Sequence, residues 1–176
     1  MQSITNTVIG TYAPDFELPG TDKAVHHLAR YLDRYKAVGI VFLSNVCPDV
    51  KRVLPQLLQL QADLAPQGFT LIGINPNDTV QASTEGMEAM QQFAQAEALT
   101  FPYIRDVTQD VVQAFGASQT PEAFVLDQAG IIRYQGRVTG EGGETPLKDA
   151  AIAILQQQPV QTAQTQPAGT NILWKR

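Results

Sequence analysis

One apolar run, AVGIVFL at positions 37–43, constrains the fold of this chain more than any other segment. It is rich in β-branched residues and has no polar interruption, as is typical of a strand buried on both faces of a parallel sheet. Pro48 then suits the first turn of a helix, and apolar residues recur at helical spacing up to Leu64. A second apolar run follows at 69–78. Because two parallel strands joined by a helix form a right-handed βαβ unit, we expect an α/β fold.

The rest of the chain predicts a single domain with a short appendage. With 176 residues, 44% of them hydrophobic, it can bury one core without a metal or a disulfide. We expect a domain at residues 1–158 and an extended, polar C-terminal tail at 159–176, whose end NILWKR packs on the domain. The other expected elements are a hairpin at 13–25, helices at 26–35, 83–98, 108–116 and 145–158, and antiparallel strands at 122–127 and 131–138.

Charge and hydropathy exclude several classes of partner. The net charge is −5 and the 12 basic residues are dispersed, so nucleic acid and anionic lipid are not expected partners. The longest apolar stretch is too short to cross a bilayer and the N-terminus lacks the pattern of a secretion signal, which together predict a cytoplasmic protein. His26 and His27 are adjacent and do not share a helical face, so neither a metal site nor a cofactor is expected.

Cys47 is the only cysteine of the chain and lies where the first apolar run meets the expected helix. At a helix N-terminus, unpaired backbone N–H groups and the helix dipole favour a thiolate, which is the nucleophilic form. Ser44 and Asn45 precede it and Pro48 follows it, and these four are the candidate catalytic residues. The alternative is that Cys47 is only a small core residue, as most lone cysteines are. Asp49 could tune the thiol or could simply favour the helix start.

Several motifs, taken in order, resemble the redoxin branch of the thioredoxin-like superfamily, where thioredoxin-like reductases and AhpC/TSA-type peroxiredoxins meet. They are APDF at 13–16, NVCP at 45–48, INPND at 74–78, QTPEAFVLDQAG at 119–130 and YQGRV at 134–138. The resemblance implies a thioredoxin-like fold with a central mixed sheet, flanking helices and an N-terminal β-hairpin extension.

The same resemblance implies a docking role for the residues that precede the hairpin strand. In this superfamily a cis-proline faces the cysteine, and the backbone edge beside it stays free to pair with an extended substrate. Thr120 and Pro121 match that position and Glu122 follows directly, so these three are the candidate substrate-binding residues. Glu122 could also tune the thiol. An ordinary trans turn before a strand is the alternative for the Thr-Pro pair.

The chain departs from the family at each position that would supply a second redox group. Val50 stands where thioredoxins have their second cysteine, and Thr170 stands where one redoxin group has a cysteine near its C-terminus. Ser44 replaces the peroxiredoxin threonine and Pro121 replaces the arginine that holds peroxide, which makes efficient peroxidase chemistry the weaker interpretation. The candidates to substitute for that arginine are Arg52 and Arg105.

We therefore predict a single-cysteine thiol oxidoreductase or antioxidant protein. Cys47 would form a mixed disulfide or a sulfenic acid, and an external thiol would complete the cycle, because the chain has no second cysteine. The expected partners are protein or low-molecular-weight thiols and disulfides, and the sequence specifies no oligomeric state. The alternative is a non-catalytic binding module that has lost its resolving cysteines and uses the groove between Cys47 and Pro121.

Overall fold

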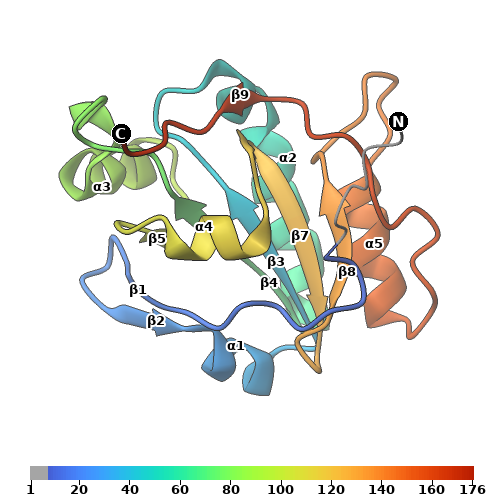
Figure 1. Ribbon diagram of the computed structural model, residues 1–176. Helices are drawn as coiled ribbons and strands as arrows, with labels where there is room; N and C mark the ends of the chain where they lie inside the picture. Colours follow the sequence, from blue (N-terminus) through green and yellow to red (C-terminus); the bar gives the residue numbers. More distant parts are fainter. Residues whose placement is uncertain (1–7) are drawn as a thin grey trace, which may run out of the picture.

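A five-stranded mixed sheet forms the centre of the protein in the computed structural model, which describes residues 8–176 (Figure 1). The strand order across the sheet is β5 (Tyr103–Arg105), β4 (Phe69–Asn75), β3 (Ala37–Phe42), β7 (Glu122–Asp127) and β8 (Ile132–Gly136). β4 pairs in parallel with both β3 and β5, whereas β3–β7 and β7–β8 are antiparallel. Every residue of β3 and β4 is buried, as the two apolar runs predict.

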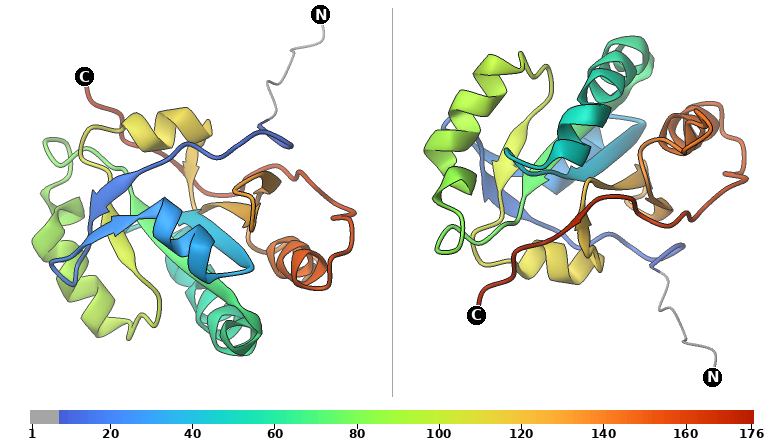
Figure 2. Two further views of the ribbon diagram at one scale, coloured as in Figure 1. Left: turned by 90° about the horizontal axis from the view of Figure 1, so that it is seen from below. Right: turned by 90° about the horizontal axis from the view of Figure 1, so that it is seen from above.

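Helices and a hairpin cover the two faces of the sheet (Figure 2). One face packs against α2 (Pro48–Leu64), α3 (Met87–Ala96) and α5 (Pro146–Leu155). The other face packs against α1 (Leu28–Arg34), α4 (Asp110–Phe115) and the hairpin of β1 (Glu17–Pro19) and β2 (Val25–His27). The expected central mixed sheet, flanking helices and N-terminal hairpin are confirmed. Within residues 8–176, no helix has the length and apolarity that crossing a membrane requires.

Several elements differ from the sequence prediction. The helix expected at 26–35 begins only at Leu28, because Val25–His27 form β2. The helix expected at 83–98 begins only at Met87, because the 3₁₀ turn η2 (Ser83–Glu85) precedes it and Gly86 is its N-cap. The sequence does not predict β5, since this three-residue strand is defined by its pairing with β4 and has no strand pattern of its own. A second 3₁₀ turn, η1 (Ala65–Gln67), follows the C-terminus of α2.

The C-terminal tail crosses the end of the sheet at which α2 begins (Figures 1 and 2). Its strand β9 (Thr170–Asn171) pairs antiparallel with β6 (Gln119–Thr120), a two-residue strand that precedes β7. Ile172 is 3% exposed and belongs to the core on the α4 face, so the tail is anchored on its own domain. The division of the chain at residue 158 stays a prediction.

Candidate functional site

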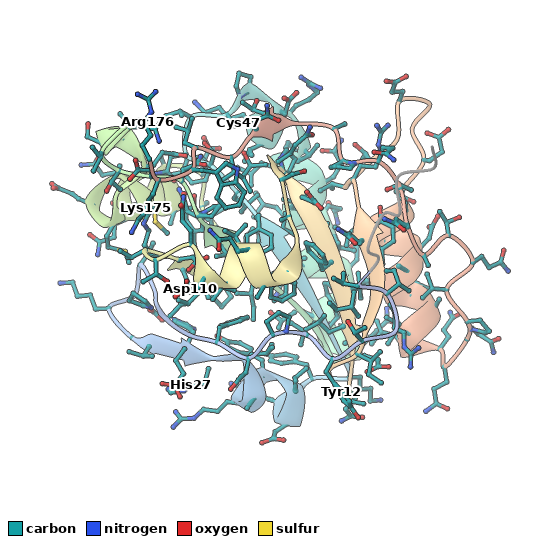
Figure 3. The ribbon with its side chains drawn as sticks, viewed as in Figure 1. Tyr12, His27, Cys47, Asp110, Lys175 and Arg176 are labelled. Carbon is teal, nitrogen blue, oxygen red and sulfur yellow. The ribbon has the colours of Figure 1, made fainter. Side chains whose placement is uncertain are left out.

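The junction between β3 and α2 places Cys47. The residue is the N-cap of α2, with extended backbone angles (φ −71°, ψ 122°), and Pro48 is the first residue of the helix. The hydroxyl oxygen of Ser44 accepts hydrogen bonds from the backbone N–H groups of Val46 and Cys47, both at 3.2 Å. Ser44 therefore shapes the turn that carries the cysteine. Figure 3 shows Cys47 beneath the tail, at the end of the molecule opposite His27.

Two oxygen atoms contact the sulfur of Cys47. Sγ lies 3.4 Å from the carbonyl oxygen of Thr120 and 3.3 Å from Oγ1 of Thr170. The Thr170 hydroxyl lies in turn 3.4 Å from Oδ2 of Asp49, in the first turn of α2. The Thr120–Pro121 peptide bond is cis, as the resemblance implies. A thiol can donate to either oxygen, and the hydroxyl can rotate to donate to a thiolate, so the site accommodates both forms of the cysteine.

The backbone edge beside Thr120 is already paired. The family resemblance implies that this edge is free for a substrate, but the tail of the chain occupies it, with Thr120 opposite Thr170. Gly169 makes this approach possible, because a Cβ atom at that position would lie 2.2 Å from the carbonyl oxygen of Thr120. With the tail in place, Cys47 is only 5% exposed.

Glu122 supports the loop that precedes Pro121. Its side chain is buried, and Oε1 accepts the backbone N–H groups of Ser118 at 2.9 Å and Gln119 at 3.4 Å. Oε2 accepts a hydrogen bond from the side chain of Gln135 at 3.2 Å. The carboxylate is therefore engaged in holding β6 in place, whereas the sulfur is contacted by the carbonyl of Thr120.

A fully buried carboxylate, Glu85, links the loop that carries Cys47 to the tail. Its Oε1 accepts the backbone N–H of Asn45 at 2.7 Å, and its Oε2 accepts a hydrogen bond from Nδ2 of Asn77 at 2.5 Å. Oδ1 of Asn77 then accepts the backbone N–H of Leu173 at 2.9 Å. Glu85 is not among the site residues predicted from the sequence, although it follows shortly after the INPND motif.

The side chain of Asn45 holds this loop from the inside. Its Oδ1 accepts a hydrogen bond from the hydroxyl of Tyr103 at 2.7 Å, and its Nδ2 donates to the carbonyl oxygen of Thr84 at 2.9 Å. Burial raises the pKa of Tyr103 well above its usual value, so this hydroxyl stays a hydrogen-bond donor. Asn45 thus acts on the backbone before the cysteine, and its side chain is engaged away from the sulfur.

Both candidate arginines are engaged in other contacts. Arg105 is buried, and its guanidinium donates to Oδ1 of Asn75 at 3.1 Å and to the carbonyl oxygen of Asn77. Burial lowers the pKa of Arg105, and nearby acidic groups oppose that shift. The side chain of Arg52 is largely exposed and pairs with Asp49 at 2.6 Å. Each cation therefore already has its partners.

The histidines lie on the hairpin at the far end of the molecule (Figure 3). Nε2 of His26 lies 2.9 Å from Asp22, and Nδ1 of His27 lies 3.2 Å from Glu17. Among residues 8–176, no three His, Cys, Asp or Glu side chains gather as a metal site would require.

Comparison with known proteins matches residues 9–135 to the AhpC/TSA family. The crystal structure of a hypothetical protein from Sinorhizobium meliloti is 33% identical, covers 99% of this chain and 97% of that one, and has a TM-score of 0.89. Thiol-disulfide oxidoreductase ResA of Geobacillus thermodenitrificans is 28% identical over 129 residues, which are 73% of this chain and 69% of that protein.

A third comparison shows the fold alone. The crystal structure of peroxidoxin BcpB from Mycobacterium tuberculosis is 19% identical, covers 85% of this chain and 96% of that one, and has a TM-score of 0.67. Together with the sheet order and the position of α2, this likeness confirms the thioredoxin-like fold that the sequence motifs predict.

Proposed function

Since the chain belongs to the AhpC/TSA family, we propose that it is a thiol oxidoreductase that acts through Cys47 alone. The observation that carries the proposal is the position of Sγ, at the N-terminus of α2 and 3.4 Å from the strand edge at Thr120. The thiolate is the nucleophilic form of a cysteine, and at this position it can attack a disulfide held along the strand edge. The name of the relative ResA, a thiol-disulfide oxidoreductase, agrees with this chemistry.

The proposed cycle consists of two thiol–disulfide exchanges. In the first, the Cys47 thiolate attacks one sulfur of a substrate disulfide, forms a mixed disulfide and expels the other sulfur as a thiolate. In the second, an external thiolate attacks the mixed disulfide and releases Cys47. The second thiol must come from outside because Val50 and Thr170 stand where a second cysteine would be. The substrates are protein or low-molecular-weight disulfides, and the donors are thiols of the same classes.

An antioxidant role would use the same thiolate. Attack of Cys47 on a peroxide breaks the O–O bond, gives a sulfenic acid and releases the other oxygen as water or an alcohol. An external thiol then condenses with the sulfenic acid, releases water and leads back to the mixed disulfide of the main cycle.

Native protein incubated with glutathione disulfide is expected to gain one glutathionyl group, at Cys47. The reason is that this sulfur is the only thiol of the chain and lies at the N-terminus of α2, next to the strand edge at Thr120. Intact-mass measurement gives the stoichiometry, dithiothreitol should remove the adduct, and Cys47→Ser should gain none. An adduct that forms only after the protein is denatured would refute the proposed exchange.

Hydrogen peroxide is expected to oxidise Cys47 no faster than an ordinary protein thiol. Rapid reaction needs a fixed positive group at the peroxide, and the guanidinium groups of Arg52 and Arg105 are already bound to other residues. Stopped-flow fluorescence or quenched-flow alkylation measures the rate, with Cys47→Ser as the blank. Oxidation several orders of magnitude faster than glutathione itself would show an efficient peroxidase and contradict this expectation.

A second candidate function is the binding module, which the covered sulfur favours. Cys47 is almost fully buried and the strand edge beside it is occupied. If Cys47→Ser retains every activity of the wild type toward its physiological partner, binding is the function and the thiol is dispensable. If that substitution abolishes exchange while the fold is intact, the oxidoreductase stands.

A further inference from the structure

Strand β9 forms a single layer between Cys47 and solvent. Thr170 and Asn171 are both exposed, and the hydroxyl of Thr170 lies directly on the sulfur at 3.3 Å. Gly169 passes so close to Thr120 that a side chain there would overlap the backbone of β6. Any protein disulfide that reaches the sulfur along β6 must therefore take the place of β9.

Beyond β9, the tail is held by backbone and side-chain hydrogen bonds and by one buried apolar side chain. The side chain of Gln109 donates to the carbonyl oxygen of Leu173 and accepts the N–H of Lys175, both at 2.9 Å. The N–H of Ile172 donates to the carbonyl oxygen of Ser118 at 3.1 Å, and its side chain is buried. Leu173 accepts the N–H of Asp78 at 2.9 Å and donates its own N–H to Asn77 at 2.9 Å. The ladder itself has only two residues on β9, both exposed, and such a short pairing is of the kind that opens locally while the rest of the domain stays folded.

The docked residues have distinct requirements at three positions. The first must be glycine, because a Cβ atom at Gly169 would meet the carbonyl of Thr120 at 2.2 Å. The second, Thr170, presents its side-chain oxygen to the sulfur. The third, Asn171, is exposed, so any side chain fits there. The fourth, Ile172, lies on the same side of the extended chain as Thr170, and its side chain packs in the core.

We propose that residues 169–172 are a built-in occupant of a strand-docking site and close it in the resting protein. The open site takes a protein disulfide whose cysteine lies on an extended segment of the pattern glycine, cysteine, any residue, aliphatic residue. Such a cysteine would place its sulfur where Oγ1 of Thr170 lies, next to Cys47. The exchange step rests on the proposed function: the Cys47 thiolate bonds to that sulfur, and the second sulfur of the substrate leaves as a thiolate.

Closure is tested by labelling Cys47 in native protein with a bulky maleimide. Gly169→Ala is expected to react about tenfold faster than wild type, because a covered thiol reacts through the open state and the clash with Thr120 raises the population of that state. The matched control is Gly142→Ala, where the added methyl group meets only the mobile end of the Glu144 side chain. Ile172→Ala removes the buried side chain that anchors the tail, so Cys47 of this variant should also react faster than in the wild type. Wild-type rates in both folded tail variants, checked by circular dichroism, would refute closure by the tail.

The substrate pattern is tested with peptides of the tail sequence, PAGCNILW, in which cysteine replaces the threonine and carries thionitrobenzoate as a mixed disulfide. Gly169→Ala protein should release thionitrobenzoate from this peptide about tenfold faster than from peptides with alanine at the glycine or aspartate at the isoleucine. Wild-type protein should react with the first peptide more slowly than Gly169→Ala does. Equal rates for the three peptides would refute the pattern.

These two measurements separate the inference from the function on which it rests. If maleimide labels Gly169→Ala faster but neither the peptides nor free dithionitrobenzoate react with Cys47, the tail closes the site and the oxidoreductase proposal fails. If dithionitrobenzoate reacts at equal rates with the wild type and Gly169→Ala, the thiol is reactive and closure by the tail fails.

Discussion

Thr170→Cys is expected to close an internal disulfide with Cys47 and to convert the protein into a two-cysteine form. The atoms Sγ of Cys47 and Oγ1 of Thr170 are 3.3 Å apart, so a small side-chain rotation brings two sulfur atoms to the bonding distance of about 2.05 Å. The bond would close a loop of about 120 residues, for which the chain-entropy model gives a stabilisation of roughly 4–5 kcal/mol. Few single substitutions in this chain can raise the free energy of unfolding as much.

The matched control for this prediction is Asn171→Cys. Adjacent residues on a strand point to opposite sides, so a thiol at position 171 should face away from Cys47 while it belongs to the same two-residue strand. Under mild oxidant, thiol counting should give no free thiols in Thr170→Cys and two in Asn171→Cys. Urea unfolding with and without reductant gives the stabilisation. Two free thiols in both variants would mean that the tail does not hold the position seen over Cys47.

The redox consequence follows from the same geometry. A disulfide between positions 47 and 170 removes the need for an external thiol in the second step of the cycle, because the tail cysteine can attack the mixed disulfide from within the chain. In the oxidised form a covalent bond keeps the strand edge at Thr120 covered, whereas in the reduced form only the pairing of β9 with β6 covers it and the tail can open. The variant should therefore release glutathione from Cys47 without added thiol, which the wild type should be unable to do.

Much of the fold could be predicted because the continuous apolar runs indicate strands that are buried on both faces. β3 and β4 are buried at every position, and Pro48 marks the start of α2. β5 escaped prediction because three residues ending in Arg105 carry no pattern of their own and are fixed by their pairing with β4. Turn residues predicted the hairpin, and the family resemblance that the ordered motifs carry implied the central mixed sheet.

The candidate site could be predicted only in part. Motif order brought Cys47 and Thr120 together, and the structure places their atoms in contact. The apolar end NILW predicted that the tail packs on its own domain, but its pairing with the strand edge at Thr120 was missed, because that pairing depends on backbone hydrogen bonds, which leave no trace in a polar sequence such as TQPAGT. For this pairing the sequence signal is Gly169, and the need for glycine there becomes visible once the backbone of Thr120 is known to lie close to it. The burial of Glu85 likewise depends on partners far away in the sequence.

Glu85→Ala is expected to lower the free energy of unfolding by about 2–6 kcal/mol, the sum for two buried hydrogen-bond donors that lose their acceptor. The two donors are the backbone N–H of Asn45 and the side-chain amide of Asn77. Each buried donor without an acceptor lowers the free energy of unfolding by about 1–3 kcal/mol. The substitution also removes a negative charge that opposes the effect of burial on Arg105. The control is Glu88→Ala on α3, an exposed glutamate three residues away, which should change stability by less than about 0.5 kcal/mol.

Glu85→Gln tests whether Glu85 couples the cysteine loop to the tail. Both partners of the carboxylate are hydrogen-bond donors. The oxygen of a glutamine can accept from one of them, but its NH₂ group then faces the other donor. If its oxygen stays on Asn45, then Asn77 has to turn its amide and can no longer accept the N–H of Leu173. We therefore expect about half the stability loss of Glu85→Ala, together with faster maleimide labelling of Cys47 at a denaturant concentration where the domain is still folded. Stability and labelling both at the wild-type level would mean that Glu85 does not couple the cysteine loop to the tail, since no orientation of a glutamine satisfies two donors at once.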